Sequence, residues 1–171
     1  MRNKSCAVIT EPPVCFPWGF DEEDLHCVGL KLLILNRLSY MQAKGVTCFY
    51  IPIDAGIGLY ASELTVSLME TNKEILLYSL IPYEEQAVKW SPELRNRYYA
   101  IQGHYTKPIL ISRERTPTCE LDAMLEAIDR VDYVLAACAR DQPQDRNYAT
   151  ALRYAQKSRR DVQRISAPEL C

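Results

Sequence analysis

The fold class is decided by one stretch, Ile51-Pro52-Ile53-Asp54-Ala55-Gly56-Ile57-Gly58-Leu59-Tyr60-Ala61-Ser62-Glu63. An apolar run from residue 46 ends in it, a short turn with two glycines follows, and a helical pattern begins. α/β proteins often bind phosphate at a strand, glycine turn and helix, because N–H groups at the helix start point outward and the helix dipole favours negative charge. The stretch predicts an α/β protein and raises the question whether the turn still binds an anion.

Apolar runs and helical patterns alternate along the rest of the chain. We expect strands at 5–10, 46–53, 74–81, 107–112 and 131–139, with a short sixth at 162–165. Helices are expected from Asp21 to about Lys44, after the glycine turn, at 84–90, from Pro92, over 121–128 and at 147–160. Such alternation predicts a mostly parallel sheet of five to six strands with helices on both faces. The expected fold is one three-layer α/β domain over residues 1–171, with its core at about 5–165.

Composition and charge limit which partners and which cellular compartment we expect for this protein. The net charge is −2 and the pI is about 5.8, which gives no electrostatic reason to expect nucleic acid or an anionic membrane. The seven cysteines include no C-x-x-C pair, so we expect reduced thiols rather than disulfides or a zinc site. The apolar stretch near the start is too short for a signal peptide, and no run approaches the roughly 20 residues of a membrane span. We therefore expect a cytoplasmic protein.

A ligand site is expected where the parallel strands end. In open α/β sheets, ligands lie outside the carboxyl ends of the strands, at the point where the strand order reverses. The segments that meet there are 10–13, 52–58, 82–86, 112–119 and 139–148. Phe16 and Trp18, in an aromatic loop near this edge, are the best candidates for a lid or an interface anchor.

Several short pieces match a known family in order and spacing. They include Gly19-Phe20-Asp21-Glu22-Glu23-Asp24, Gly45-Val46-Thr47-Cys48-Phe49, Ala61-Ser62-Glu63 and Arg95-Asn96-Arg97-Tyr98. With these pieces the chain resembles the YpsA-like branch of the SLOG superfamily, which also includes the DNA-processing protein Smf/DprA and the LOG nucleotide phosphoribohydrolases. The resemblance implies a Rossmann-like fold and a nucleotide-derived ligand.

The positions that face the ligand in that family are altered here. Where the branch typically ends its first strand with Thr-Gly-His-Arg, this chain has Ile9-Thr10-Glu11-Pro12. The family's turn Gly-Gly-x-x-Gly-Val-Asp corresponds to Pro52-Ile53-Asp54-Ala55-Gly56-Ile57-Gly58, which lacks the paired glycines. An expected Arg-Asn pair falls on Ala123-Met124, and a late Gly-Gly-Thr turn falls on Arg146-Asn147-Tyr148. Glu11 and Asp54 are expected to repel an anion at this edge.

Each candidate site residue has an alternative structural interpretation. Glu63 is either a ligand contact or a surface carboxylate, and Trp90 with Arg95, Arg97 and Tyr98 forms either a phosphate-clamping wall or core packing with exposed ion pairs. Arg113, Arg115 and Arg146 lie on loops where arginine could replace lost phosphate donors. The ligand-binding candidates are Thr10, Glu11, Gly56, Gly58, Glu63, Trp90, Arg95, Arg113 and Arg146; no catalytic or metal-binding residue and no cofactor is predicted.

Two functions follow from this pattern, with a third as an alternative. The first is a non-catalytic SLOG-type binding protein with a remodelled or lost nucleotide pocket, which recognises a nucleotide-derived ligand or a protein partner, including a second copy of itself. The second is a LOG-like hydrolase of a nucleotide N-glycosidic bond, which would need a phosphate cradle and an Arg/Glu pair. The third, an accessory role in DNA processing, is weakened by the acidic balance of the chain.

Overall fold

Six parallel strands form one sheet in the order β4-β3-β2-β1-β5-β6. The structure is a computed structural model, and it describes residues 3–167. The strands are β1 (Lys4–Thr10), β2 (Val46–Pro52), β3 (Leu76–Tyr83), β4 (Lys107–Ser112), β5 (Tyr133–Cys138) and β6 (Asp161–Ser166). Because the chain moves outward from β1 to β4 and then returns to β5 on the other side of β1, the strand order reverses between β1 and β5. The α/β class and the parallel sheet expected from the sequence are confirmed.

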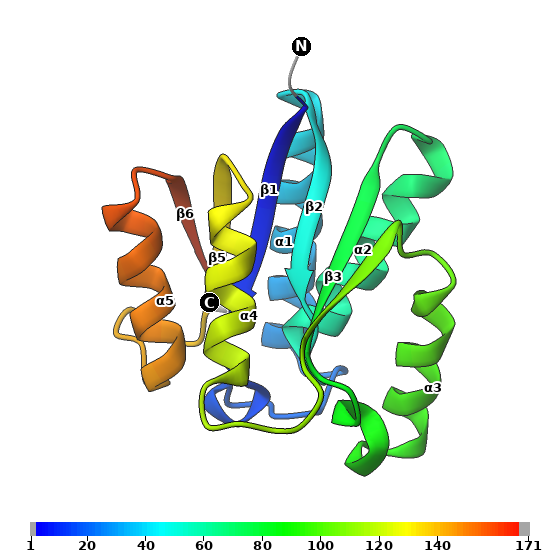
Figure 1. The fold of residues 1–171 in the computed structure, drawn as a ribbon, viewed down its shortest axis with the longest axis vertical. Helices are drawn as coiled ribbons and strands as arrows, with labels where there is room; N and C mark the ends of the chain where they lie inside the picture. Colours follow the sequence, from blue (N-terminus) through cyan, green and yellow to red (C-terminus); the bar gives the residue numbers. More distant parts are fainter. Residues whose placement is uncertain (1–2, 168–171) are drawn as a thin grey trace.

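Helices cover both faces of this sheet (Figure 1). They are α1 (Leu25–Ala43), α2 (Ile57–Thr71), α3 (Pro92–Gln102), α4 (Cys119–Asp129) and α5 (Arg146–Lys157), with short 3₁₀ turns η1 (Pro13–Cys15) and η2 (Gln86–Lys89). Buried residues of α1, α2 and α3 share one apolar cluster, and those of α4 and α5 share another. This is the three-layer arrangement of a Rossmann-like fold.

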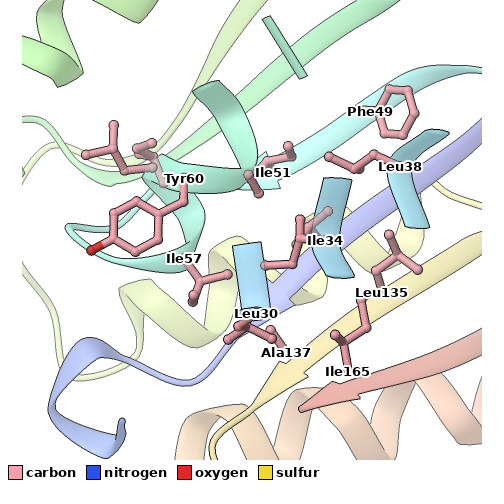
Figure 2. Packing of buried hydrophobic residues seen from close by; sticks show 14 of the residues in the cluster. Leu30, Ile34, Leu38, Phe49, Ile51, Ile57, Tyr60, Leu135, Ala137 and Ile165 are labelled. Atoms are coloured by element: carbon pink, nitrogen blue, oxygen red, sulfur yellow. The ribbon is translucent and has the colours of Figure 1, made fainter. Parts of the chain in front are cut away.

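The alternation of side chains along β1 explains the two layers. Cys6 and Val8 belong to the cluster under α1 and α2, whereas Ala7 and Ile9 belong to the cluster under α4 and α5. All four are buried, as expected for a central parallel strand covered on both faces. Figure 2 shows how Leu30, Ile34 and Leu38, spaced along one side of α1, lie over the residues of the sheet.

Two of the expected helix boundaries are wrong. α1 begins at Leu25, not after Asp21, because the Asp24 carboxylate caps it by accepting the N–H groups of His26 and Cys27. The segment 84–90 forms only the 3₁₀ turn η2. At its other end, α1 closes as expected before Gly45, whose φ of +96° suits glycine.

Proline 82 does not end the third strand. β3 continues through Pro82 to Tyr83, where it still pairs with Ser112 of β4. The ladder with β2 ends earlier, at the pair Pro52 and Leu80. Because β2 no longer flanks β3 at this point, a residue without an N–H is tolerated there.

The expectation that Phe16 and Trp18 form a lid or an interface anchor is also wrong. Their exposed fractions are 4% and 9%, and both belong to the cluster under α1 and α2. The two ring centroids lie 5.0 Å apart. The loop that carries them therefore closes the core beside α1, and burial of the two rings stabilises it.

Candidate functional site

A cleft of about 770 Å³ lies at the carboxyl end of the sheet. The loops that follow the strands gather below the sheet in Figure 1 and contribute most of its walls. The lining residues come from all the segments expected from the topology, together with Phe20, Trp90 and the start of α4. The volume falls within the range of small-molecule sites. The cleft is therefore the candidate functional site.

Glu11 lies fully buried at the end of β1. Its Oε1 accepts the N–H of Ala139 at 3.1 Å, and its Oε2 accepts those of Gln144 and Asp145 at 2.9 and 3.0 Å. These three donors belong to the loop between β5 and α5, a concave set of N–H groups of the kind that binds anions. The Glu11 carboxylate thus sits where an external anion could bind, and it satisfies the donors of that position itself.

Asp54 does the same at the glycine turn. Its Oδ1 accepts the N–H groups of Gly56 and Gly58, both at 2.9 Å, where α2 begins. These are the donors that would face a phosphate at the start of this helix. An internal carboxylate therefore satisfies the donors of this turn.

The two glycines of the turn are required by close packing. A Cβ on Gly58 would lie 2.5 Å from the carbonyl oxygen of Pro52 and 3.0 Å from Asp54 Oδ1. A Cβ on Gly56 would lie 2.7 Å from Cγ of Pro13. Any larger residue would therefore push the turn away from β2 or from the β1 loop. These contacts explain both glycines without a ligand.

Several prolines at the rim of the cleft leave it with few backbone N–H donors. Each lacks the N–H through which a loop at this edge would hold a phosphate. The five that line the cleft are Pro12, Pro13, Pro52, Pro82 and Pro117. They come from the loops or ends of four successive strands. These parts of the rim are consequently rigid and poor in backbone hydrogen-bond donors.

Burial raises the pKa of Asp54 to about 6, although the hydrogen bonds from Gly56 and Gly58 lower it in part. The carboxyl group of Asp54 consequently titrates close to neutral pH. A strongly shifted carboxyl group in a cleft is a feature of functional sites as well as of buried polar networks. Nearby, burial and the charges of Glu11 and Asp145 raise the pKa of Cys15 to about 11, so this residue is a thiol at neutral pH.

The structure distributes the candidate residues between the cleft and the surface. Thr10 and Trp90 line the cleft, and Glu11 and the two turn glycines lie at its edge through the contacts above. Arg95 donates to the carbonyl of Val88 and does not line the cleft. Arg113 and Arg146 are exposed beside it and are also absent from its lining. Arg115, from the loop after β4, is the arginine that lines it.

Glu63 and Arg97 form an ion-pair network away from the cleft. The Arg97 guanidinium contacts Glu63 Oε1 at 2.6 Å and Glu22 Oε2 at 2.6 Å, and Lys31 contacts Glu22 Oε1 at 2.6 Å. The hydrogen bonds that Arg97 donates to both glutamates raise its pKa. The network joins the loop before α1 to α2 and α3. Both charges of the Glu63–Arg97 pair are therefore engaged in holding helices together.

Several cleft residues were not among the sequence candidates. They are Phe20, Tyr83, Gln86, Glu120 and Met124. Gln86 follows β3 in a segment that topology places at this edge, which was the available signal. Tyr83 lies in the same segment, and Phe20 lies in one of the pieces that resemble the family. Glu120 and Met124 carry no local motif, so only the fold brings them to the cleft.

Searches for other kinds of site cover the described part of the chain. Within residues 3–167, no group of three or more His, Cys, Asp or Glu side chains is placed to hold a metal ion. The six cysteines in this range are free thiols, and Cys171 lies outside it. None of the helices between residues 3 and 167 has the length and hydrophobicity needed to cross a membrane.

Asp54 gives the stability of the protein a pH dependence of defined sign. Its pKa lies above the ordinary value of 3.8, so the folded protein binds more protons than the unfolded chain between the two values, and the free energy of unfolding falls as the pH rises. Asp54→Asn keeps an oxygen acceptor but cannot titrate. From about pH 4 to about pH 7, we expect the wild type to lose on the order of 2–3 kcal/mol relative to Asp54→Asn in urea denaturation. A difference that stays constant with pH would contradict the assignment.

Comparisons with known proteins identify the family. Residues 18–170 match the family described as the YspA SLOG family (YpsA). A 72-residue segment, 42% of this chain, is 29% identical to the UPF0398 protein BH1768 of Halalkalibacterium halodurans and spans 38% of that protein's length.

A solved ketoreductase domain from the bacillaene assembly line aligns with 96% of this chain and 51% of its own, at 11% identity and a TM-score of 0.30. The match to the SLOG family covers most of the chain and agrees with the Rossmann-like sheet. This chain belongs to the YpsA family of SLOG proteins.

Proposed function

We propose that this chain is a non-catalytic binding protein, whose cleft recognises a nucleotide-derived small molecule without a phosphate cradle. The observation that carries the proposal is the occupation of both sets of main-chain donors by internal carboxylates, Glu11 in one and Asp54 in the other. A cleft of about 770 Å³ remains beside them.

Energetics favour the internal carboxylates over an external phosphate. A phosphate that displaced Glu11 would take over three hydrogen bonds but leave a buried carboxylate without donors. Hydrogen bonds to charged groups contribute about 1.5–3 kcal/mol each, and leaving a buried charge unpaired costs at least as much. The exchange therefore gains no hydrogen bonds, and the phosphate also loses translational and rotational entropy when it binds.

No observation of this kind supports the alternative function, hydrolysis of a nucleotide N-glycosidic bond. It calls for a phosphate cradle and an Arg/Glu pair at the ligand. The Arg97–Glu63 pair is engaged between helices, and neither residue lines the cleft. The net charge of −2 also gives no electrostatic support to a DNA-processing role.

Removing the Asp54 carboxylate should restore an anion site. In Asp54→Ala, the N–H groups of Gly56 and Gly58 lose their acceptor at the start of α2. We expect millimolar inorganic phosphate to raise the melting temperature of this variant by about 3–5 °C, the shift that binding at tenfold the Kd gives a chain of this size. Under the same conditions phosphate should leave the wild type unshifted, and AMP should stabilise it no more than adenosine does.

The matched control is Asp141→Ala, at an exposed position. It should respond to phosphate as the wild type does, with potassium chloride used to match ionic strength. Stabilisation of the wild type by several degrees with inorganic phosphate, or by AMP more than by adenosine, would contradict the proposal, since it would show that the cradle still accepts phosphate.

A protein partner is a second candidate, and the outer face of α1 favours it. Leu25, Val28 and Leu32 are exposed along the side of the helix opposite to its buried residues, followed by Tyr40. Leu32, at 62%, is among the most exposed apolar side chains described. Exposed apolar side chains grouped on one side of a helix are a feature of interaction surfaces. The partner we propose is a second copy of this chain, because this stripe is uncharged and two copies would meet without like-charge repulsion.

Sedimentation velocity tests this dimer. We expect the wild type to dimerise and Leu32→Glu to be monomeric, because two-fold packing would bring the new carboxylates together in an apolar contact. Val88→Glu, at an exposed apolar position on η2, is the control and should sediment as the wild type. A wild type that stays monomeric at high micromolar concentration would exclude the dimer.

A further inference from the structure

Gln86 presents a buried acceptor with no partner among the described residues. The side chain lines the cleft and is 7% exposed. Its Nε2 donates to the carbonyl oxygen of Ile53 at 2.8 Å, whereas its Oε1 has no hydrogen bond. Buried polar atoms in native proteins are almost always paired, so an exception beside a cleft calls for an explanation.

The orientation of this amide is fixed by its surroundings. If the amide were turned over, Oε1 would lie against the Ile53 carbonyl oxygen, and two acceptors would face each other. The hydrogen bond from Nε2 therefore leaves Oε1 as the free end. The group that satisfies it must carry an N–H or O–H donor.

Several other polar groups of the cleft offer acceptors, and its carboxylates outnumber its cations. Asp54 uses only Oδ1 for the turn, so its second oxygen is available. Thr10 donates its hydroxyl proton to the Glu11 carbonyl, which leaves the hydroxyl lone pairs. Three carboxylates line the cleft, those of Asp54, Glu120 and Asp145, against one guanidinium, that of Arg115. This balance disfavours an anion and suits a ligand rich in donors.

The walls of the cleft suit a flat ring. Trp90 and Tyr83 line it together with the five prolines, and Phe20 lies at its mouth with most of its ring exposed. The Trp90 ring is held edge-on to Tyr98 at a centroid distance of 5.3 Å. Proline and aromatic faces pack against planar rings without asking for hydrogen bonds.

We propose that the cleft binds an uncharged, planar heteroaromatic ring bearing an exocyclic amino group, as in an aminopurine or aminopyrimidine base or nucleoside, and that Gln86 Oε1 accepts an amino hydrogen. This assignment rests on the proposed function and specifies the part of a nucleotide that the cleft reads. In this proposal Gln86 determines specificity for the amino group, because its hydrogen bond to Ile53 leaves Oε1 as a free acceptor in the cleft wall.

A pair of nucleosides that differ only in the amino group tests the proposal with the wild-type protein. The probes are adenosine and purine riboside, titrated by ¹⁵N-edited NMR, with AMP as a third probe. We expect adenosine to bind about tenfold more tightly than purine riboside, the factor that a single hydrogen bond to a buried acceptor gives. At saturation, adenosine should also shift the side-chain amide signal of Gln86 by more than purine riboside does.

Gln86→Met separates recognition from structural support. It removes both amide functions, so some loss of stability is expected from the bond to Ile53 alone. The decisive readout is the affinity ratio of the two nucleosides, which should fall to about one, because stacking on the walls is common to both. Gln156→Met, at an exposed position on α5, should keep the wild-type ratio. If Gln86→Met does not fold, the ratio of the two nucleoside affinities in the wild type and the shift of the Gln86 amide signal still test the proposal.

The outcomes separate this inference from the proposed function. Equal binding of adenosine and purine riboside would overturn the role of Gln86 and leave a phosphate-independent cleft in place. Failure of both nucleosides to bind would overturn the ligand class. Tighter binding of AMP than of adenosine would instead overturn the proposed function, because the added phosphate would then be recognised.

Discussion

The architecture of the site depends on one buried interaction, between the Glu11 carboxylate and three N–H groups of the β5–α5 loop. It lies where the strand order reverses, between neighbouring strands β1 and β5. A fully buried carboxylate is unfavourable unless donors surround it, and a loop with several inward N–H groups is equally unfavourable without an acceptor. Each of the two therefore requires the other, and together they fix the loop against the end of β1.

Asp54 repeats this arrangement one strand away. There the donors belong to the start of α2, and the carboxylate comes from the preceding residues of the same turn. Both positions are places where a Rossmann-like sheet commonly holds an anion that arrives from solution. In this chain the anions are the side-chain carboxylates of Glu11 and Asp54, so the N–H donors at both positions are satisfied without a ligand. What remains open is a cleft with proline and aromatic walls, in which carboxylates outnumber cations.

The sequence predicts the fold well because alternation of strands and helices is a local signal repeated along the whole chain. The position of the cleft is also predictable, since strand order and direction place the loops at one edge. The partners of Glu11 are not, because they lie 128 to 134 residues away, and no local pattern links them. Phe16 and Trp18 were misjudged for a related reason: an aromatic loop has the same composition whether it covers a cleft or closes a core. Topology places Gln86 at this edge of the sheet, but only the structure reveals its free oxygen.

The central claim is that internal carboxylates hold the anion-binding donors of this fold. Couplings measured by NMR across hydrogen bonds test it most directly, since they detect which acceptor each amide uses. The account predicts couplings from the amide nitrogens of Ala139, Gln144 and Asp145 to the side-chain carboxyl carbon of Glu11, and these should persist in excess inorganic phosphate. Couplings that disappear when phosphate is added, with saturable shifts of the same three amides, would contradict it.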